Sequence, residues 1–287
     1  MWSRTPTNLA AALALSFAGT AWGQTSRPAA TQPAGDEVVE RTPAKGKADE
    51  KAAALAARVM ETMGGAKAWA ETRVITWTFF GSRRHVWDKA TGDIRMEGGN
   101  AESGKQVIVM NLNSGAGRAW RNGTEMTTGN QLEKALEQAR SAWINDSYWL
   151  VMPYKLRDPG VTLRSMGPKQ TAAGNDAEVL ELTFEGVGAT PQNKYHVYVG
   201  TRSGLVEQWD FFRTAADTES VFQSPWTGWK KYGRIMLSGG RGQMRGRDAK
   251  LTDIAVMDEP PAGVFTDPNW TPPASTTTDA ADSTTND

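Results

Sequence analysis

Beyond residue 73 the sequence alternates apolar and polar residues in short runs, and this pattern restricts the possible folds more than any other feature. Residues 73–80, for example, place Ile75, Trp77 and Phe79 on one face of a strand. Turn residues such as Asn122-Gly123 separate the runs. These connections are too short for the helical crossovers of a parallel sheet, so the pattern predicts an antiparallel meander.

The predicted strands form two groups, one on each side of a helical segment. They cover residues 73–80, 83–87, 93–96, 106–111 and 118–121, and then 161–165, 178–184, 194–199, 204–212, 221–230, 234–237 and 250–256. An amphipathic helix precedes them, because Leu55, Val59 and Met63 form one stripe that ends at Gly64-Gly65. We therefore expect a mainly β (α+β) fold, a curved antiparallel half-barrel of about 11 strands whose concave face is covered by helices.

Residues 143–160 combine large apolar side chains with residues that end helices. A helix over residues 131–143 leads into this segment, and Asn145-Asp146 are expected to cap the second part of a helical pair. Pro153 interrupts the helix before a turn at residues 158–160. The large side chains of the segment need a broad hydrophobic surface, so they either seal a core or line a pocket; they are Trp143, Tyr148, Trp149, Met152 and Tyr154.

The two ends of the chain differ in composition from its middle. An apolar run within residues 1–23 predicts a signal peptide that is cleaved near Gly23-Gln24. Residues 24–47 and 271–287 are rich in Ala, Thr, Pro, Ser and charge, which predicts a disordered leader and tail. The half-barrel domain is expected to span residues 48–270. Because no later apolar run is long enough to cross a membrane, we expect a periplasmic or secreted protein.

The composition excludes several classes of function. The chain has no cysteine, which excludes a disulfide framework, thiol catalysis and an acceptor for a lipid anchor. Its 32 basic and 32 acidic residues give zero net charge, so bulk electrostatics favours neither nucleic acid nor anionic membranes. The two histidines, His85 and His196, lie in predicted strands without the spacing of metal ligands. We therefore predict no metal, no cofactor and no catalytic residue.

Three motifs connect the chain to a known family. They are Met63-Gly-Gly followed by Ala68-Trp69, the pattern of residues 143–160, and Val187-Gly…Thr-Pro191. In these motifs the chain resembles an uncharacterised family of secreted bacterial proteins that is labelled lipoprotein-sorting-like. The meander, the helices and the Pro-rich residues 259–265 also resemble the periplasmic lipoprotein-carrier superfamily, the LolA/LolB-like half-barrels. That resemblance implies a hydrophobic cavity for acyl chains, with a lipid, a lipoprotein or an envelope protein as partner.

The expected ligand site uses the aromatic residues on the covered face of the sheet. Trp2 and Trp22 fall in the predicted signal peptide, so ten of the twelve tryptophans remain, and these are difficult to pack without gaps. A tryptophan-rich core without a cavity is the alternative. Displacement of a lid around Pro153 is expected to admit the ligand. Strand parity and the resemblance together select the wall and lid residues Trp77, Phe79, Trp120, Trp149, Met152, Tyr154, Trp209 and Phe211.

Two other functions stay open at this point. An envelope hydrolase would use the same pocket, with His196 or Glu207 as acid or base, since Glu207 shares the parity of Trp209. A non-catalytic interaction scaffold would use the sheet edges and the tails. The basic residues 239–247 are expected to form a solvated hairpin loop, with contact to lipid headgroups as a second interpretation.

Overall fold

The computed structural model describes residues 46–272 apart from residues 101, 103, 188–189 and 245. The predicted signal peptide, nearly all of the leader and most of the tail lie outside the described residues. Within the described part of the chain, no helix is both long enough and apolar enough to cross a membrane.

Two helices precede the main run of strands. The first, α1 (Glu50–Thr62), begins at Asp49, whose carboxylate accepts a hydrogen bond from the Ala52 backbone N–H at 2.8 Å. The predicted apolar stripe of this helix is buried. Gly64 adopts a left-handed φ of 114°, which ends α1 and allows α2 (Gly65–Glu71) to start in a new direction.

A nine-stranded antiparallel sheet contains the first group of predicted strands. Its order is β13-β14-β15-β2-β3-β4-β5-β6-β7. The predicted alternation in β2 is confirmed, because Ile75, Trp77 and Phe79 enter the main core while Val74 packs on the opposite face. The strands are β2 (Val74–Phe79), β3 (Arg83–Asp88), β4 (Asp93–Gly98), β5 (Gln106–Asn111), β6 (Gly117–Arg121), β7 (Thr124–Glu125), β13 (Thr227–Tyr232), β14 (Ile235–Met244) and β15 (Arg247–Met257).

A six-stranded sheet contains most of the second group, in the order β1-β8-β9-β10-β11-β12. Its neighbouring strands are antiparallel except for the short β1, which runs parallel to β8. The strands are β1 (Lys47–Ala48), β8 (Val161–Gln170), β9 (Asp176–Phe184), β10 (Lys194–Gly200), β11 (Val206–Phe212) and β12 (Phe222–Pro225).

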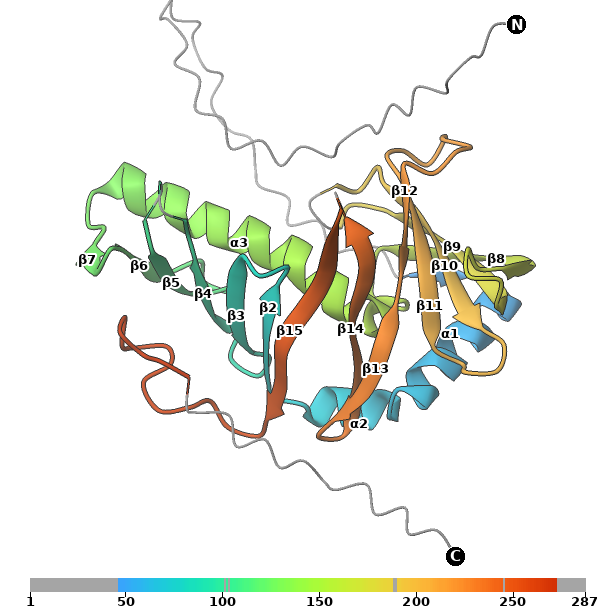
Figure 1. Cartoon of the computed structure of the whole chain (residues 1–287), viewed down its shortest axis with the longest axis horizontal. Helices are drawn as coiled ribbons and strands as arrows, with labels where there is room; N and C mark the ends of the chain where they lie inside the picture. Colours follow the sequence, from blue (N-terminus) through green and yellow to red (C-terminus); the bar gives the residue numbers. More distant parts are fainter. Residues whose placement is uncertain (1–45, 101, 103, 188–189, 245, 273–287) are drawn as a thin grey trace, which may run out of the picture. The chain divides into compact units, whose positions relative to one another are not determined.

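The two sheets meet at Trp226, between β12 and β13. β12 pairs with β11 and β13 pairs with β14, so one stretch of chain belongs to both sheets. The Trp226 backbone N–H donates to the carbonyl of Glu207 at 2.8 Å, and its ring is buried. Figure 1 shows the resulting open, curved arrangement of strands. The predicted mainly β half-barrel with helices on its concave face is confirmed.

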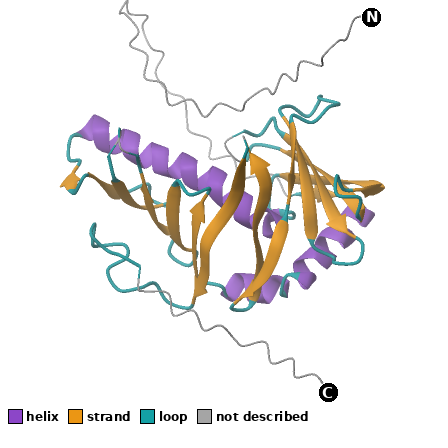
Figure 2. Cartoon of the chain, viewed as in Figure 1, coloured by secondary structure: helices purple, strands orange, loops and turns teal. Residues whose placement is uncertain are grey.

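One long helix, α3 (Gly129–Val151), lies along the concave face of the nine-stranded sheet (Figures 1 and 2). Its first half packs on β5 and β6, and the helix also contacts β14. The 3₁₀ helix η1 (Met152–Lys155) follows directly, with Pro153 in its first turn. Pro153 therefore ends α3 and starts η1, since proline lacks the N–H that a longer α-helix would require.

The predicted break within α3 is wrong. Asn145-Asp146 do not cap a second helix, because α3 continues through them to Val151. The Asp146 side chain is fully buried and bonds to two side chains of β3, as described below. A short polar side chain within a helix is tolerated when a tertiary partner satisfies it, and the sequence alone does not show that partner.

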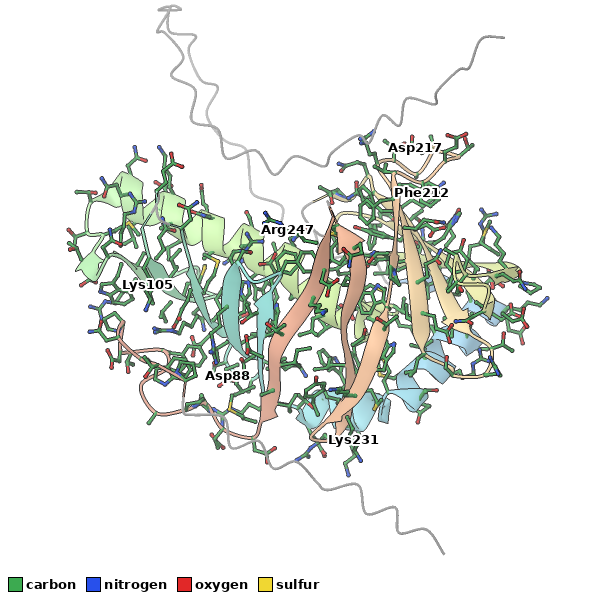
Figure 3. The ribbon with its side chains drawn as sticks, viewed as in Figure 1. Asp88, Lys105, Phe212, Asp217, Lys231 and Arg247 are labelled. Carbon is green, nitrogen blue, oxygen red and sulfur yellow. The ribbon has the colours of Figure 1, made fainter. Side chains whose placement is uncertain are left out.

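The predicted solvated loop at residues 239–247 is also wrong. Residues 239–244 belong to β14 and Arg247 begins β15, and the Arg241 side chain is buried. The glycines there make room for neighbouring strands: a Cβ atom on Gly240 would lie 2.2 Å from Thr227 Oγ1. Arg247 is exposed near the tip of the β14–β15 hairpin (Figure 3), and Arg245 lies outside the described residues.

Candidate functional site

The end of α3, the concave face of the six-stranded sheet and the end of β2 in the nine-stranded sheet bring together aromatic rings that we call the aromatic surface. Ring-to-ring contacts with centroid distances from 4.1 to 6.4 Å connect all of its members. Its partly buried rim consists of Phe80, Tyr148, Trp149, Phe184, Tyr195 and Phe222, and its buried floor consists of Phe79, Trp209 and Phe211. The rim residues other than Phe222 pack against the main core.

Trp209 in β11 is the centre of the aromatic surface. Its ring lies 4.6 Å from that of Trp149 in an edge-on arrangement, and 5.0 Å from that of Tyr195. The sheet register sets these contacts, because Phe211 is paired with Tyr195 on one side and with Phe222 on the other. Burial raises the pKa of Tyr195 to about 12, so its phenol is neutral near physiological pH.

Phe80 reaches the rim through an unusual backbone conformation. Its φ is 45°, in the left-handed region that bulky residues rarely adopt, and it lies in the turn between β2 and β3. The ring stacks on Phe79 at 4.1 Å and meets Trp149 edge-on at 5.4 Å. Such a conformation costs about 1–2 kcal/mol, and strained residues of this kind often cluster at functional sites.

The structure distributes the eight predicted site residues over three places. Four belong to the aromatic surface: Phe79, Trp149, Trp209 and Phe211, of which Phe79 and Trp209 are also part of the main core. Trp77, Met152 and Tyr154 are buried in the main core, and the Tyr154 ring stacks on Trp69 at 4.3 Å.

Trp120 lies away from the predicted concave face, so that expectation is wrong. Its neighbour Ala119 packs with the residues of α3, and alternation along β6 turns Trp120 to the other side, against the guanidinium of Arg118. The small residue faces the helix because the helix is close there: a Cβ atom on Gly117 would lie 2.7 Å from Leu136 Cδ2.

Five rim residues are absent from the predicted set of site residues, and they differ in how clearly the sequence pattern indicates them. Phe184 and Tyr195 lie two residues from the core residues Leu182 and Val197 and so on the same strand face, which means that strand parity could have identified them. The position of Phe80 depends on its left-handed backbone, which no local pattern indicates. Tyr148 and Phe222 complete the set.

A buried ionic cluster fixes the same part of α3 to the sheet. The Asp146 carboxylate accepts hydrogen bonds from Arg83 at 2.7 and 2.9 Å, and its Oδ2 lies 2.7 Å from His85 Nε2. Burial opposes ionisation of Asp146, but the hydrogen bonds from Arg83 and His85 outweigh it and lower the pKa of the carboxyl. The His85 ring also stacks on Trp77 at 4.7 Å.

Several buried ring N–H groups in this region lack a hydrogen-bond partner among the described residues. They belong to Trp77, Trp143, Trp209 and Trp226, and His85 Nδ1 is likewise unpartnered. Most buried polar groups in proteins are paired with protein groups or with ordered water, so these indole N–H groups need an acceptor that the described residues do not supply. The Trp77 ring stacks on His85 of the ionic cluster, Trp209 belongs to the aromatic surface, and the Trp226 ring contacts Trp209. The Trp143 ring contacts Trp87.

The residues considered for acid or base chemistry are held in other contacts. His196 Nε2 lies 3.2 Å from Glu181, which also binds Arg164, and burial lowers the pKa of His196. Glu207 was expected to point inward, and that expectation is wrong: a bulge in β11 puts Val206 into the core in its place. The Glu207 carboxylate instead accepts hydrogen bonds from Asn175 and Ser203.

The described residues contain no group of three or more His, Cys, Asp or Glu side chains that could hold a metal ion. The site consists of aromatic rings, buried N–H groups without a partner among the described residues, and one buried arginine, Arg241.

Comparison with known proteins gives distant likenesses to solved structures. No protein-family model and no curated protein matches the chain. A solved structure of a DUF1329 family protein from Desulfovibrio piger is similar over 76% of this chain and 98% of its own, at 11% identity and a TM-score of 0.38. MucB in complex with MucA(peri) is similar over 75% of this chain and 58% of its own, at 12% identity and a TM-score of 0.21.

The Pseudomonas aeruginosa MucA/MucB complex gives a further match, over 55% of this chain and 50% of the matched chain, at 16% identity and a TM-score of 0.20. At these TM-scores the likenesses carry no conclusion about function, which therefore has to be argued from the site itself.

Proposed function

We propose that the protein is a non-catalytic periplasmic or secreted carrier that binds a hydrophobic ligand, such as a lipid acyl chain, on the aromatic surface. The rim of six connected, incompletely buried rings is the observation that supports this most strongly. Each ring would gain from removal of its remaining apolar area from water. Binding of an acyl chain across the rim would remove that area from water.

The route of entry follows from which parts of the site are anchored. The predicted hinge at Pro153 is held by its neighbour Tyr154, whose hydroxyl accepts a hydrogen bond from the Met236 N–H at 3.1 Å. That hydroxyl also lies within hydrogen-bond distance of the carbonyls of Met63 and Met236. We therefore assign the opening to rotation of the rim side chains, above all Trp149 and Phe222, rather than to movement of η1.

Binding of a fluorescent fatty-acid analogue tests the proposal. Trp149→Ala removes a rim ring and should weaken binding by at least tenfold, which corresponds to about 1.4 kcal/mol. Leu132→Ala is the matched control, since Leu132 is also half-buried on α3 but packs under its first half. Equal affinity of the wild type and both variants, or no binding to the wild type, would contradict the proposal.

A further inference from the structure

Arg241 is a buried cation behind the aromatic surface. It belongs to β14, and its side chain is 1% exposed. Its guanidinium donates to the hydroxyl of Ser238 at 2.9 Å, to the carbonyls of Ser238 and Gly240 at 3.1 and 2.7 Å, and to the carbonyl of Trp149. It also lies over the Trp226 ring, with Cζ 3.6 Å from the centroid. All of these partners are uncharged.

Two other deeply placed arginines have a carboxylate partner, which makes Arg241 different. Arg83 binds Asp146, and the buried Arg95 binds Glu97 in addition to several carbonyls. No Asp or Glu among the described residues forms an ion pair with Arg241, and burial alone holds the pKa of its guanidinium well below the usual range. A buried charge without a counter-charge is unfavourable. Arginine nevertheless keeps its proton in proteins, so the positive charge of Arg241 remains.

The donors around Arg241 exceed the acceptors. Arg241 Nε and the indole N–H groups of Trp226 and Trp209 have no partner among the described residues. The Trp226 ring contacts the guanidinium, and the Trp209 ring lies 5.4 Å from that of Trp226. Water could accept hydrogen bonds from these groups, but it would leave the positive charge uncompensated. An anionic oxygen would supply both the acceptor and the charge.

Trp149 connects this cation to the aromatic surface. Its ring belongs to the rim, while its backbone carbonyl accepts from Arg241. If the Trp149 ring turns aside when an acyl chain binds, as in the proposed function, a headgroup attached to that chain would approach the guanidinium.

We propose that Arg241, with the indole N–H groups of Trp209 and Trp226, binds the anionic headgroup of a single-chain amphiphile, a carboxylate or a phosphate monoester, whose chain lies on the aromatic surface. This inference rests on the proposed function. It adds that the ligand is an acid, so that a neutral lipid of the same chain length is selected against.

Titration calorimetry with hexadecanoate and with hexadecanol tests this on the wild-type protein, at a pH at which the carboxylate is ionised. The acid should bind at least tenfold more tightly than the alcohol. Equal affinities would overturn the headgroup site while leaving the carrier function intact. If neither ligand binds, the carrier function fails, and the headgroup site fails with it.

Variants assign the preference to Arg241. Arg241→Met, which keeps most of the side-chain volume, should remove the preference for the acid over the alcohol, measured as the ratio of the two affinities in the folded variant. Arg241→Lys should retain part of that preference. Circular dichroism at the binding temperature checks that each variant is folded. A preference that survives in folded Arg241→Met would overturn the assignment. If an equal concentration of inorganic phosphate displaces hexadecanoate, the site binds a free anion, and the proposal that its ligand is an amphiphile is overturned.

Discussion

The two halves of α3 pack on the sheets through different kinds of side chain. The first half, residues 129–142, packs its alanines and leucines on aliphatic side chains of β4, β5 and β6. The second half, residues 143–151, bears Trp143, Tyr148 and Trp149 and meets rings from both sheets. We call these the aliphatic half and the aromatic half.

The two halves of α3 also differ in how completely the side chains around them are buried and paired. Under the aliphatic half, small side chains allow a close approach, and the buried cluster Ile94, Met96, Ile108 and Met110 is apolar throughout. Under the aromatic half, an ionic cluster anchors the helix while the rings around it are half-exposed and several N–H donors lack partners. We infer that the first half holds the helix in place so that the second half can keep an incompletely buried surface.

Removal of Asp146 should have the largest effect, because it breaks the anchor of the aromatic half. Asp146→Ala would leave His85 buried and Arg83 largely buried with no carboxylate between them. Breaking a buried pair in this way costs about 3–5 kcal/mol. Urea unfolding measures the loss, and a loss below about 1 kcal/mol would place the cluster among weak surface contacts.

The same cluster predicts how stability depends on pH. The folded-state pKa of Asp146 is lowered, so its contribution is present above the unfolded value of about 3.9 and is lost as the pH falls through the folded value. The difference in unfolding free energy between the wild type and Asp146→Asn should therefore shrink on acidification. Urea unfolding over a series of acidic pH values measures this, and a difference that stays constant would contradict the assignment.

The floor and the rim of the aromatic surface should respond differently to truncation. Trp209→Ala removes a buried ring and should cost about 3–5 kcal/mol of stability. Trp149→Ala removes a half-exposed ring and should affect the binding of ligand more than the stability of the fold. Thermal unfolding and titration with a fatty-acid analogue, performed on both variants, give the comparison. If Trp149→Ala unfolds the protein, the rings form a core and the two halves of α3 do not differ in role.

Overpacking tests the aliphatic half by itself. A Cβ atom on Gly117 would lie 2.5 Å from the Val109 carbonyl oxygen and 2.7 Å from Leu136 Cδ2. Gly117→Ala should therefore cost about 1–3 kcal/mol of stability and leave the affinity for ligand unchanged. A loss of affinity at full stability would show that the aliphatic half also contributes to binding.

The smallest effect concerns the strained backbone of Phe80. Phe80→Gly and Phe80→Ala remove the same ring, so both should weaken binding equally. The glycine variant should nevertheless be more stable by about 1 kcal/mol, because glycine adopts the left-handed φ without a steric penalty. Thermal unfolding of the pair measures the difference, and equal stability would show that the turn changes its conformation in the variants.

The sequence predicts the fold better than the site, and particular residues show why. Alternation in β2 identifies the inward residues Trp77 and Phe79, because a sheet with one buried face imposes a period of two. The same reasoning fails for Glu207, because a bulge shifts the strand register. It also fails for Trp120, because the nearby helix α3 packs on Ala119, which takes the inner face.

Polar side chains within regular elements were the hardest to place from the sequence. Asp146 has the composition of a helix cap, and Arg241 lies in a glycine-rich segment that has the composition of a loop. Both are buried because of partners distant in the chain: Arg83 and His85 for the first, and Trp149 and Trp226 for the second. Local patterns contain no information about such partners.

Mass spectrometry of an organic-solvent extract tests the central claim most directly. The protein would be purified from its native host without detergent, extracted, and its extract compared with that of the Trp149→Ala variant. The account predicts a stoichiometric compound with an acyl chain in the wild-type extract and much less of it in the variant. An extract without such a compound, from a protein that also takes up no fluorescent fatty-acid analogue, would show that the aromatic surface is not a ligand site.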